Sequence, residues 1–422
     1  MTTNILFLSF FYPPHCNTPS KRAMEITKRL VNYGFKFFIL SGRILTRPID
    51  YKLLKDIETE NVKNYRVVHL THMFNILQKN ILKRISLKLD FFKPGFFLSW
   101  TPFAFINATK IIAKNEIDFI YTTGPPFFAL FLGYLLKKVY KLPLIIEFRD
   151  PWMHSPYKKE EKFTKKAYMK FRNIEKKIID SADLIFVISD ALIKFLRRKF
   201  PKETKGKDIV SFPSGINLSN IPRKLSNKNQ NREINFTFLG TLYGLRDPKH
   251  LVIILDLVNS KIDLNSISLK INIFGDYDRK YLSSLLKRYG LSDFFYLGKY
   301  LSHEECLEEI QSSTLPLHIG ENIDYPTISF KVWEYLSMNK KVLYFGRDDS
   351  YTTQFLRNNE LGYIIPINDY QLGAEKFIEL IQNIKNNNLN LSVGDQKLKQ
   401  FGWEKIIKSF SSAVKNLKRN KN

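Results

Sequence analysis

The sequence predicts an α/β protein made of two doubly wound, Rossmann-like domains. Short apolar runs alternate with longer amphipathic stretches along almost the whole chain, which is typical of βα units around parallel sheets. A polar stretch without periodicity, residues 220–233, interrupts this pattern and is interpreted as a linker. With 422 residues the chain can form two cores of ordinary size. We therefore expect domains at residues 1–220 and 221–403, with a cleft between their sheets and one ligand held by each half.

Seven candidate strands precede the linker. They are residues 5–11, 35–42, 65–70, 118–124, 142–148, 182–189 and 208–215. The first strand leads into a helix for which Thr18 is the expected N-cap, Pro19 the first helical residue and Gly34 the stop signal.

Five candidate strands follow the linker, and each ends on a glycine. They are residues 234–240, 269–275, 294–298, 314–320 and 340–346. Glycine at the carboxyl end of a strand lets the backbone turn sharply and approach a ligand, which open α/β sheets bind at that edge. The alternative, that each glycine is only a turn residue, stays open for any one of them. The last segment, from Trp403, is expected to form an amphipathic helix.

Composition limits the possible classes of protein. A content of 44% hydrophobic and 25% charged residues is that of a globular chain. The N-terminus has no basic leader, and the apolar stretch 125–136 is shorter than the ~20 residues of a membrane-spanning helix, so we expect a soluble or peripheral protein. Cys16 and Cys306 show no pairing or zinc pattern, which fits a reducing cytoplasm.

The formal net charge of +26 has two explanations that remain open. One is an anionic partner: nucleic acid, a phospholipid surface or a phosphate-bearing substrate. The other is a bias toward Lys and Asn, as AT-rich coding DNA would produce.

Several strand ends carry residues suited to chemistry. Arg149 and Asp150 follow a buried strand, are expected to project toward a ligand, and are followed by Pro151, which stops the strand. A structural Arg–Asp pair is the equal alternative. In GTLYGLRDPKH (240–250), backbone amides next to glycines precede Arg246 at an expected helix start, an arrangement suited to a diphosphate. DYPTISFKVWEYL (324–336) places hydroxyls, a cation and a carboxylate where a strand passes into a helix.

These motifs together resemble glycosyltransferase family 4, in particular bacterial members that build surface polysaccharides such as lipopolysaccharide or capsule. The resemblance rests, in order, on FLSFFYPPHCNTPSKRAMEITKRLVNYG, YTTGPPFFAL, IIEFRDPW, ADLIFVIS, FLGTLYGLRDP and ISFKVWEYL, and covers nearly the whole chain. It implies the GT-B fold, with the acceptor on the first domain, a nucleotide sugar on the second, and the final helix, 404–422, crossing back to the first. It also implies a hexosyltransferase-like reaction with retention of anomeric configuration, without a bound metal or cofactor.

The resemblance also implies roles for individual residues. The Glu334 carboxylate would hold the ribose of the donor, and Ser329 and Lys331 would neutralise the leaving diphosphate. The full set is Gly240, Thr241, Arg246, Ser329 and Lys331 for the diphosphate, Pro326, Thr327 and Ile328 for the donor sugar, Asp150 and Arg149 at the reacting centre, and His15, Thr18, Ser20, Thr123, Gly124 and Trp152 for the acceptor.

Two positions depart from the family pattern. Pro326 stands where the family often has a second glutamate, and Arg149 stands where it often has a histidine. These departures leave open an alternative function, a catalytically silent GT-B scaffold in a polysaccharide assembly complex. His15 and His154 lie in loops from which either could partly replace the missing histidine.

Two further stretches have a stated interpretation. Asp276, Tyr277 and Asp278 form a D-x-D sequence, which we interpret as helix capping and not as a metal site. Residues 74–100 interleave basic and aromatic side chains, which favours contact with an anionic membrane surface over an ordinary core-packing helix. Our interpretation is a cytoplasmic glycosyltransferase, peripheral on the inner face of a bacterial membrane, that uses a nucleotide sugar and a lipid-linked or glycan acceptor and binds no nucleic acid.

Overall fold

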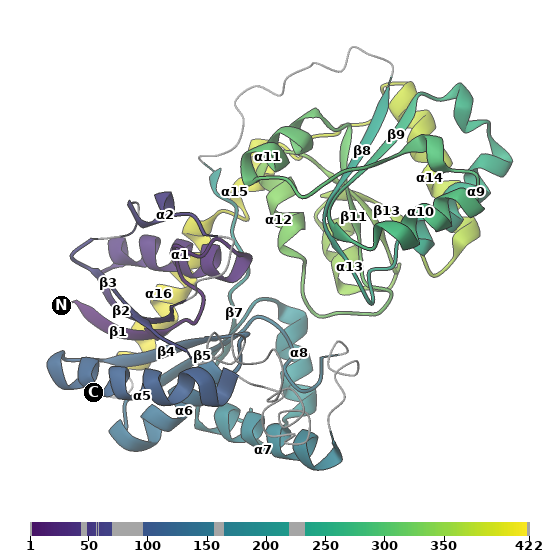
Figure 1. Cartoon of the computed structure of the whole chain (residues 1–422). Helices are drawn as coiled ribbons and strands as arrows, with labels where there is room; N and C mark the ends of the chain where they lie inside the picture. Colours follow the sequence, from purple (N-terminus) through teal and green to yellow (C-terminus); the bar gives the residue numbers. More distant parts are fainter. Residues whose placement is uncertain are drawn as a thin grey trace. The chain divides into compact units, whose positions relative to one another are not determined.

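The computed structural model describes residues 2–43, 49–55, 57, 59–69, 96–155, 164–218 and 233–419. The chain divides into two compact units, which Figure 1 shows with their element labels. Unit 1 comprises residues 1–213 and 406–422, and unit 2 comprises residues 214–405. Residues 220–232 of the expected linker lie outside the described residues. Each unit is a doubly wound α/β structure, so the predicted fold class is confirmed.

Unit 1 is built on a parallel sheet whose described strands have the order β3-β2-β1-β4-β5-β6-β7. The order reverses between β1 and β4, which pair through Ile5–Phe119 to Leu8–Thr122. All seven strands expected from the sequence are present. Their bounds are Thr3–Leu8 (β1), Phe35–Gly42 (β2), Val62–Val67 (β3), Phe119–Gly124 (β4), Leu144–Phe148 (β5), Leu184–Val187 (β6) and Ile209–Ser211 (β7).

Helices cover both faces of this sheet. On one face Leu6, Leu8 and Ile120 pack against the helices between β3 and β7. On the other face the Phe410 ring of the last helix stacks on Phe186, with centroids 4.4 Å apart. The helices of this unit are Thr18–Leu30 (α1), continued by a 3-10 turn Val31–Tyr33 (η1), Lys52–Lys55 (α2), Phe96–Lys114 (α5), Phe128–Tyr140 (α6), Lys165–Ser181 (α7), Asp190–Lys199 (α8) and Trp403–Arg419 (α16), of which residues 406 onward belong to unit 1.

The start of α1 differs by one residue from the prediction. Asn17 is the N-cap, and its side chain accepts a hydrogen bond from the backbone N–H of Ser20. Thr18 is therefore the first helical residue and Pro19 the second. Both Asn and Thr are good N-caps, so sequence preference alone does not choose between neighbours.

Unit 2 has a parallel sheet with the described order β10-β9-β8-β11-β12-β13, the dinucleotide-binding order, which reverses between β8 and β11. The strands are Ile234–Leu242 (β8), Leu269–Tyr277 (β9), Phe295–Leu297 (β10), Leu315–Ile319 (β11), Val342–Gly346 (β12) and Gly362–Pro366 (β13). The sequence did not predict β13. The expectation that every strand ends at its glycine was wrong for β8 and β9, which continue two residues beyond Gly240 and Gly275.

Two hydrophobic layers enclose the unit 2 sheet. Phe236, Leu317 and Leu343 face one layer, and Leu239 and Tyr344 face the other. The helices are Lys249–Lys261 (α9), Arg279–Arg288 (α10), His303–Ser312 (α11), Phe330–Ser337 (α12), Tyr351–Asn358 (α13), Tyr370–Lys385 (α14) and Asp395–Lys399 (α15), with 3-10 turns at Leu264–Ser266 and Ser292–Phe294. Helices α9, α10 and α14 supply the first layer, and α11, α12, α13 and α15 supply the second.

Among the described residues, no helix is both long enough and apolar enough to cross a membrane. The stretch expected to touch a membrane surface, residues 74–100, lies mostly outside the described residues. Of its aromatic side chains, Trp100 at the start of α5 is fully buried in the unit 1 core.

Candidate functional site

The candidate donor residues gather where the strand order of unit 2 reverses. Open α/β sheets bind ligands at this point, outside the carboxyl ends of the strands. The loop after β8 and the loop after β11 are joined there. Arg246 donates from Nε (3.0 Å) and Nη2 (2.6 Å) to Oε1 of Glu321, and the backbone N–H of Asn322 donates to the carbonyl of Leu245 (3.0 Å). Arg246 is thus held at the switch point by a carboxylate that the sequence interpretation missed.

A pair of glycines brings two backbones together beside this loop. Gly240 on β8 and Gly275 on β9 are register partners. A Cβ at Gly275 would lie 1.9 Å from the carbonyl oxygen of Gly240, and its φ of +122° is one that other residues rarely adopt. The expected diphosphate residues Gly240 and Thr241 therefore form part of a strand end that only glycine at position 275 permits.

The start of α12 carries the cation and the carboxylate predicted from the sequence. Lys331 Nζ lies 2.7 Å from Glu334 Oε2, and His303 Nδ1 lies 3.9 Å from Oε1 of the same carboxylate. Ser329 is the N-cap residue but makes no side-chain capping hydrogen bond. A helix N-terminus whose N–H groups are not capped attracts anions. The structure brings Lys331 and Glu334 together, as an ion pair on one helical turn.

The hydroxyl of Tyr335 fixes this helix to the sheet. The backbone N–H of Leu239 donates to it (3.2 Å), and it donates to the carbonyl of Leu317 (3.3 Å). These two residues belong to β8 and β11, the strands on either side of the switch point. The neighbouring Glu334 is therefore held at a fixed height above the sheet edge.

A buried histidine at the switch point of unit 2 is affected by the positive charges of Arg246 and Lys331. His318, on β11, is 2% exposed. Burial first, and then the positive charges of Arg246 and Lys331, hold the pKa of His318 well below its usual value. His318 is therefore neutral at physiological pH, and the positive charges that act on it are those of Arg246 and Lys331, which the structure pairs with Glu321 and Glu334.

The residues expected to contact the donor sugar lie in the loop before α12. Pro326 is half-buried and Thr327 is buried, and the carbonyl of Thr327 accepts a hydrogen bond from the Thr352 hydroxyl (3.4 Å). Ile328 packs into a hydrophobic layer of unit 2, and its expected contact with the donor sugar stays a prediction.

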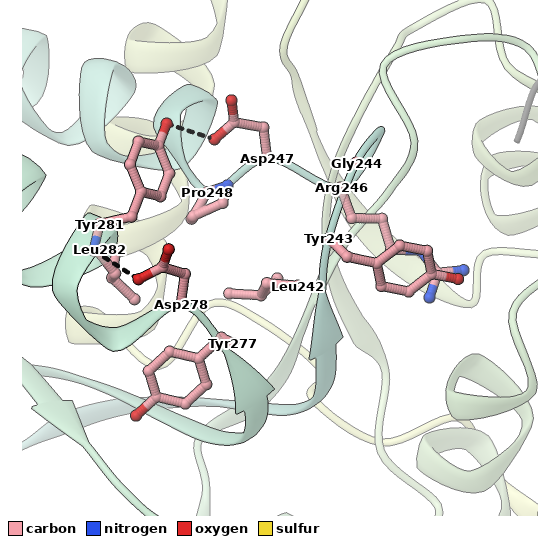
Figure 2. A pocket seen from close by; sticks show the side chains of 10 residues that line it. All are labelled: Leu242, Tyr243, Gly244, Arg246, Asp247, Pro248, Tyr277, Asp278, Tyr281 and Leu282. Carbon is pink, nitrogen blue, oxygen red and sulfur yellow. Dashed lines mark hydrogen bonds between the residues drawn. The ribbon is translucent and has the colours of Figure 1, made fainter. Parts of the chain in front are cut away.

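A pocket of about 210 Å³ lies next to Arg246, at the carboxyl ends of β8 and β9 (Figure 2). Tyr243, Tyr277 and Tyr281 are three of the residues that line it. Asp278 of the D-x-D sequence is the N-cap of α10 and accepts a hydrogen bond from the N–H of Tyr281 (2.9 Å), so the capping interpretation is confirmed. Among the described residues, no group of three His, Cys, Asp or Glu side chains is arranged to hold a metal ion.

Most of the expected acceptor residues lie at or soon after the ends of β1 and β4, the strands on either side of the switch point of unit 1. Thr123 and Gly124 end β4 and are buried. His15 is buried and Thr18 exposed in the segment that follows β1, and Ser20 is fully buried in α1. Burial lowers the pKa of His15. Because β1 and β4 are neighbours in the sheet, these segments share one edge, but the structure leaves their expected role in acceptor binding a prediction.

Arg149 does not project as expected. It is 8% exposed, and its guanidinium group donates to the backbone carbonyls of Gly124 (3.4 Å) and Pro125. It therefore ties the loop after β5 to the loop after β4, because a buried guanidinium needs partners for its donors. Asp150 is half-buried, and Trp152 is buried with its ring stacked on Phe127 (5.0 Å, 9°). A direct role of Arg149 or Asp150 in catalysis stays a prediction.

His154 is partly buried in its loop. Its ring packs against Phe200 and Phe195, with centroids 5.5 and 6.2 Å away. Burial, with the positive charges of Lys199 and Arg172, lowers its pKa to about 4. It is therefore neutral at physiological pH.

Behind the unit 1 edge lies an ion pair that the sequence interpretation missed. Arg22 on α1 donates to Glu147 Oε1 on β5, from Nε (2.9 Å) and Nη2 (2.6 Å), and the Tyr121 hydroxyl donates to Oε2 (2.9 Å). Burial alone would raise the pKa of Glu147, but Arg22 and Arg149 outweigh it and hold the pKa below its usual value. A lone glutamate inside the strand LPLIIEF was the one available signal for this pair.

The comparisons with known proteins agree with this geometry. Residues 63–220 match the model of Glycosyltransferase Family 4. No curated protein matches the sequence. Sucrose-phosphate synthase from Thermosynechococcus elongatus has a similar structure, with 14% identity and a TM-score of 0.66 over 99% of this chain and 100% of that chain. HepE from Anabaena, solved in complex with UDP, is 14% identical and has a TM-score of 0.62 over 98% of this chain and 100% of that chain. The lipopolysaccharide outer core galactosyltransferase WaaB is 11% identical and has a TM-score of 0.61 over 98% of this chain and 99% of that chain.

At these identities the solved structures establish the fold, and the family match covers part of unit 1 and the start of unit 2. The resemblance found in the sequence is confirmed to that extent. The chain has the GT-B fold, and its residues 63–220 match glycosyltransferase family 4.

Proposed function

We propose that the protein is a retaining glycosyltransferase that moves a sugar from a nucleotide-diphosphate sugar to a glycan acceptor during assembly of a surface polysaccharide. The observation that carries the proposal is the convergence of Arg246, Lys331 and Glu334 at the switch point of unit 2. Two cations and the N-terminus of α12 suit a diphosphate, and a carboxylate beside them suits the vicinal hydroxyls of a ribose.

Donor binding would exchange partners within this group. In the structure Lys331 and Glu334 neutralise each other at 2.7 Å. A diphosphate would draw Lys331 away, and the ribose hydroxyls would then donate to the freed Glu334 carboxylate. As the bond between sugar and diphosphate breaks, negative charge grows on the leaving group, and Arg246 and Lys331 stabilise it. Because two cations would meet the diphosphate, we propose that the reaction needs no metal ion.

The acceptor would bind unit 1, at the edge that carries His15, Thr123, Gly124 and Trp152. We propose a lipid-linked glycan as acceptor and an anionic membrane surface as the working location, on the inner face of the membrane. Support comes from the charge of the chain, with 66 Lys and Arg against 40 Asp and Glu, since basic proteins are attracted to anionic lipids.

A panel of nucleotide sugars, each incubated with purified protein in EDTA and again in Mg²⁺, tests this function. We expect one donor to release free nucleotide diphosphate at the same rate in both buffers. Glu334→Ala should lower kcat/KM about 10- to 100-fold, because it removes hydrogen bonds to a charged group worth about 1.5–3 kcal/mol. Glu379→Ala, an exposed carboxylate on α14 paired with Lys376, is the matched control and should leave the rate unchanged.

Proton NMR of the first-formed sugar product tests retention, since it shows whether the anomeric configuration of the donor is kept. An inverted product would refute the retaining mechanism. Vesicles with and without anionic lipid test the membrane proposal by co-sedimentation.

A catalytically silent GT-B scaffold is the second candidate function. The commitment of the Arg149 guanidinium to the carbonyls of Gly124 and Pro125 favours it, because this side chain is then not free for a substrate. Pro326, which has no hydrogen-bonding side chain for a sugar, favours it as well. Failure of every donor to bind, with the fold intact, would support the scaffold and refute the enzyme.

A further inference from the structure

Three neighbouring helices of unit 1, α5, α6 and α7, lie side by side over one face of its sheet (Figure 1). Each leads within a few residues into the next strand, β4, β5 or β6, so each ends at the edge where the strands begin. Their first turns therefore lie at the opposite, carboxyl edge, where Trp100 of α5 packs against Phe128 of α6 with ring centroids 5.5 Å apart. This is the edge that carries Thr123 and Gly124.

The outer surface of these helices carries exposed apolar side chains. Among the described residues, the exposed large apolar residues other than tyrosine are Val68, Phe103, Ile106, Val139, Met169 and Leu372. Four of these six lie on α5, α6 and α7. Exposed apolar residues scattered singly need no explanation, whereas a group on adjacent helices indicates an interaction surface.

The apolar side chains continue across the layer from one helix to the next. Phe103 and Ile106 are three residues apart, so they project from the same side of α5, and they are 38% and 52% exposed. Met169, near the start of α7, is 45% exposed. On α6, which lies between these two helices, the half-buried rings of Phe131 and Tyr134 have centroids 6.2 Å apart.

The exposed charges on the three helices are almost all positive. Helices α5 and α6 contain no Asp or Glu. In α7, Glu175 is buried, and Asp180 lies in the last turn, far from the carboxyl edge. The exposed lysines are Lys110, Lys114, Lys138, Lys165, Lys166, Lys170 and Lys177.

This combination of side chains fits a lipid surface. Apolar groups leave water when they enter the headgroup layer of a membrane, and the lysines around them would meet the phosphates of anionic lipids. A second copy of the chain is a poorer partner, because in a symmetric dimer the lysines of one copy would face the lysines of the other.

We propose that the outer surface of α5, α6 and α7 is the docking face by which the protein binds an anionic membrane, with Phe103, Ile106 and Met169 entering the headgroup layer. The inference rests on the proposed function in one respect, that the acceptor is lipid-linked. Phe103 and Met169 lie in the halves of their helices that are nearer the carboxyl edge. Docking would therefore bring the edge with Thr123 and Gly124 to the lipid surface, where such an acceptor lies.

Co-sedimentation of the full chain with vesicles tests the docking face. The vesicles would contain phosphatidylcholine alone or phosphatidylcholine mixed with phosphatidylglycerol. The wild type should bind the mixed vesicles, and Phe103→Gln with Ile106→Gln should lower the affinity by at least about tenfold, because two large apolar side chains then stay in water. Tyr300→Gln with Leu372→Gln, two exposed residues of unit 2, is the matched control and should bind like the wild type.

A second pair of variants separates the docking face from the general charge of the chain. Lys110 and Lys166 lie about one turn from Ile106 and Met169. Replacing both lysines by Gln should weaken binding to the mixed vesicles about 25-fold, since each lysine near an anionic surface contributes about fivefold.

The control for this pair is Lys287→Gln with Lys385→Gln, two exposed lysines of unit 2, which should leave the affinity unchanged. Equal losses in the two pairs would show that net charge alone attracts the protein, and would overturn the docking face.

A nitroxide label shows which part of the chain enters the lipid. In a chain with Cys16→Ser and Cys306→Ser, a label on Ile106→Cys should gain contact with oxygen and lose contact with a water-soluble nickel chelate when mixed vesicles are added. A label on Leu372→Cys should not change. A label at position 106 that is shielded from both reagents before vesicles are added would show that another part of the chain covers this surface, and would overturn the proposal.

The remaining outcomes are distinct from one another. A wild type that dimerises without lipid, with a Phe103→Gln, Ile106→Gln variant that stays monomeric, would assign the surface to a second copy of the chain instead. Unchanged vesicle affinity in that variant would overturn the docking face and leave membrane binding in place. A wild type that binds no vesicles would refute the docking face and the membrane location together, and the donor panel would still decide separately whether the protein transfers a sugar.

Discussion

Arg22 and Glu147 form a buried ion pair in unit 1. Removing either partner alone should destabilise the unit strongly, and removing both should destabilise it by less than the sum of the two single changes. Their side chains are 4% and 1% exposed, and the shortest contact is 2.6 Å. Arg22 also donates to the carbonyls of Phe212 (2.6 Å) and Pro213 (3.0 Å), and the Tyr121 hydroxyl donates to Glu147. Besides each other, the two charged groups therefore have as hydrogen-bond partners two backbone carbonyls and one tyrosine hydroxyl.

The magnitudes follow from what each substitution leaves behind. Arg22→Met leaves a buried carboxylate without its cation, and Glu147→Leu leaves a buried guanidinium without its anion; each should destabilise unit 1 by about 3–5 kcal/mol. The double variant buries no charge of the pair, and its cost is that of the unpaired Tyr121 hydroxyl and two carbonyls. We expect it to cost about 2–4 kcal/mol less than the sum of the single variants.

Urea unfolding of protein labelled with 5-fluorotryptophan measures the free energy of unfolding of unit 1 in each variant, because the tryptophans of the two units give separate signals. Trp100 and Trp152 lie in unit 1, and Trp333 and Trp403 lie in unit 2. The exposed pair Lys376–Glu379 on α14 is the control cycle and should show a coupling below about 1 kcal/mol.

The pH dependence gives an independent check. The pKa of Glu147 is held below its usual value in the folded protein, so its contribution to stability is present above the unfolded pKa and lost as pH falls through the folded pKa. Glu147→Leu should lack this loss at acid pH. Single variants whose costs add up to that of the double variant would refute the reasoning.

Three further substitutions have definite expected outcomes. Glu175→Gln should stabilise unit 1 at pH 9, because burial raises the pKa of Glu175 from 4.5 to about 8 in the folded protein. The stability that protonated Glu175 contributes is present below pH 4.5 and is lost as the pH rises to 8, by up to about 5 kcal/mol. Unfolding curves followed at Trp100 over a series of pH values would measure this loss. Gly275→Ala should lower the Tm of unit 2 and abolish donor binding, because the new Cβ would collide with the Gly240 carbonyl. Calorimetry would measure both effects, and unchanged donor binding would contradict the prediction. Tyr335→Phe should cost about 1–3 kcal/mol by leaving a buried backbone N–H unpaired, and should weaken donor binding, measured by titration calorimetry.

Most of the fold follows from local patterns, whereas much of the site does not. Buried parallel strands such as β5 and β11 are continuous apolar runs, so the sequence predicts them directly. Strand β13 was missed because its five residues, GYIIP, contain only two aliphatic residues and lie between two polar segments. The N-cap of α1 depended on a choice between two suitable neighbours.

For the site, the sequence places hydroxyls, cations and carboxylates at strand ends, and parallel topology then brings those ends to one edge. It does not show partners from distant segments. Glu321 lies 75 residues from Arg246, and nothing local indicates that they pair. Arg149 was expected to face a ligand because its position after a strand suggests exposure; its actual partners, the carbonyls of the preceding loop, appear only when both loops are folded.

The position of α16 has a consequence for synthesis of the chain. Its Phe410 ring fills the centre of unit 1, beside Tyr121, Phe186 and Phe212, yet it follows the whole of unit 2 in the sequence. On the ribosome, unit 2 can therefore finish folding while unit 1 still lacks part of its core. Through that interval, the aromatic side chains that Phe410 later covers remain open to water, to chaperones and to other nascent chains. A chain cut after residue 405 would stay in that condition, with unit 2 folded and unit 1 prone to aggregate.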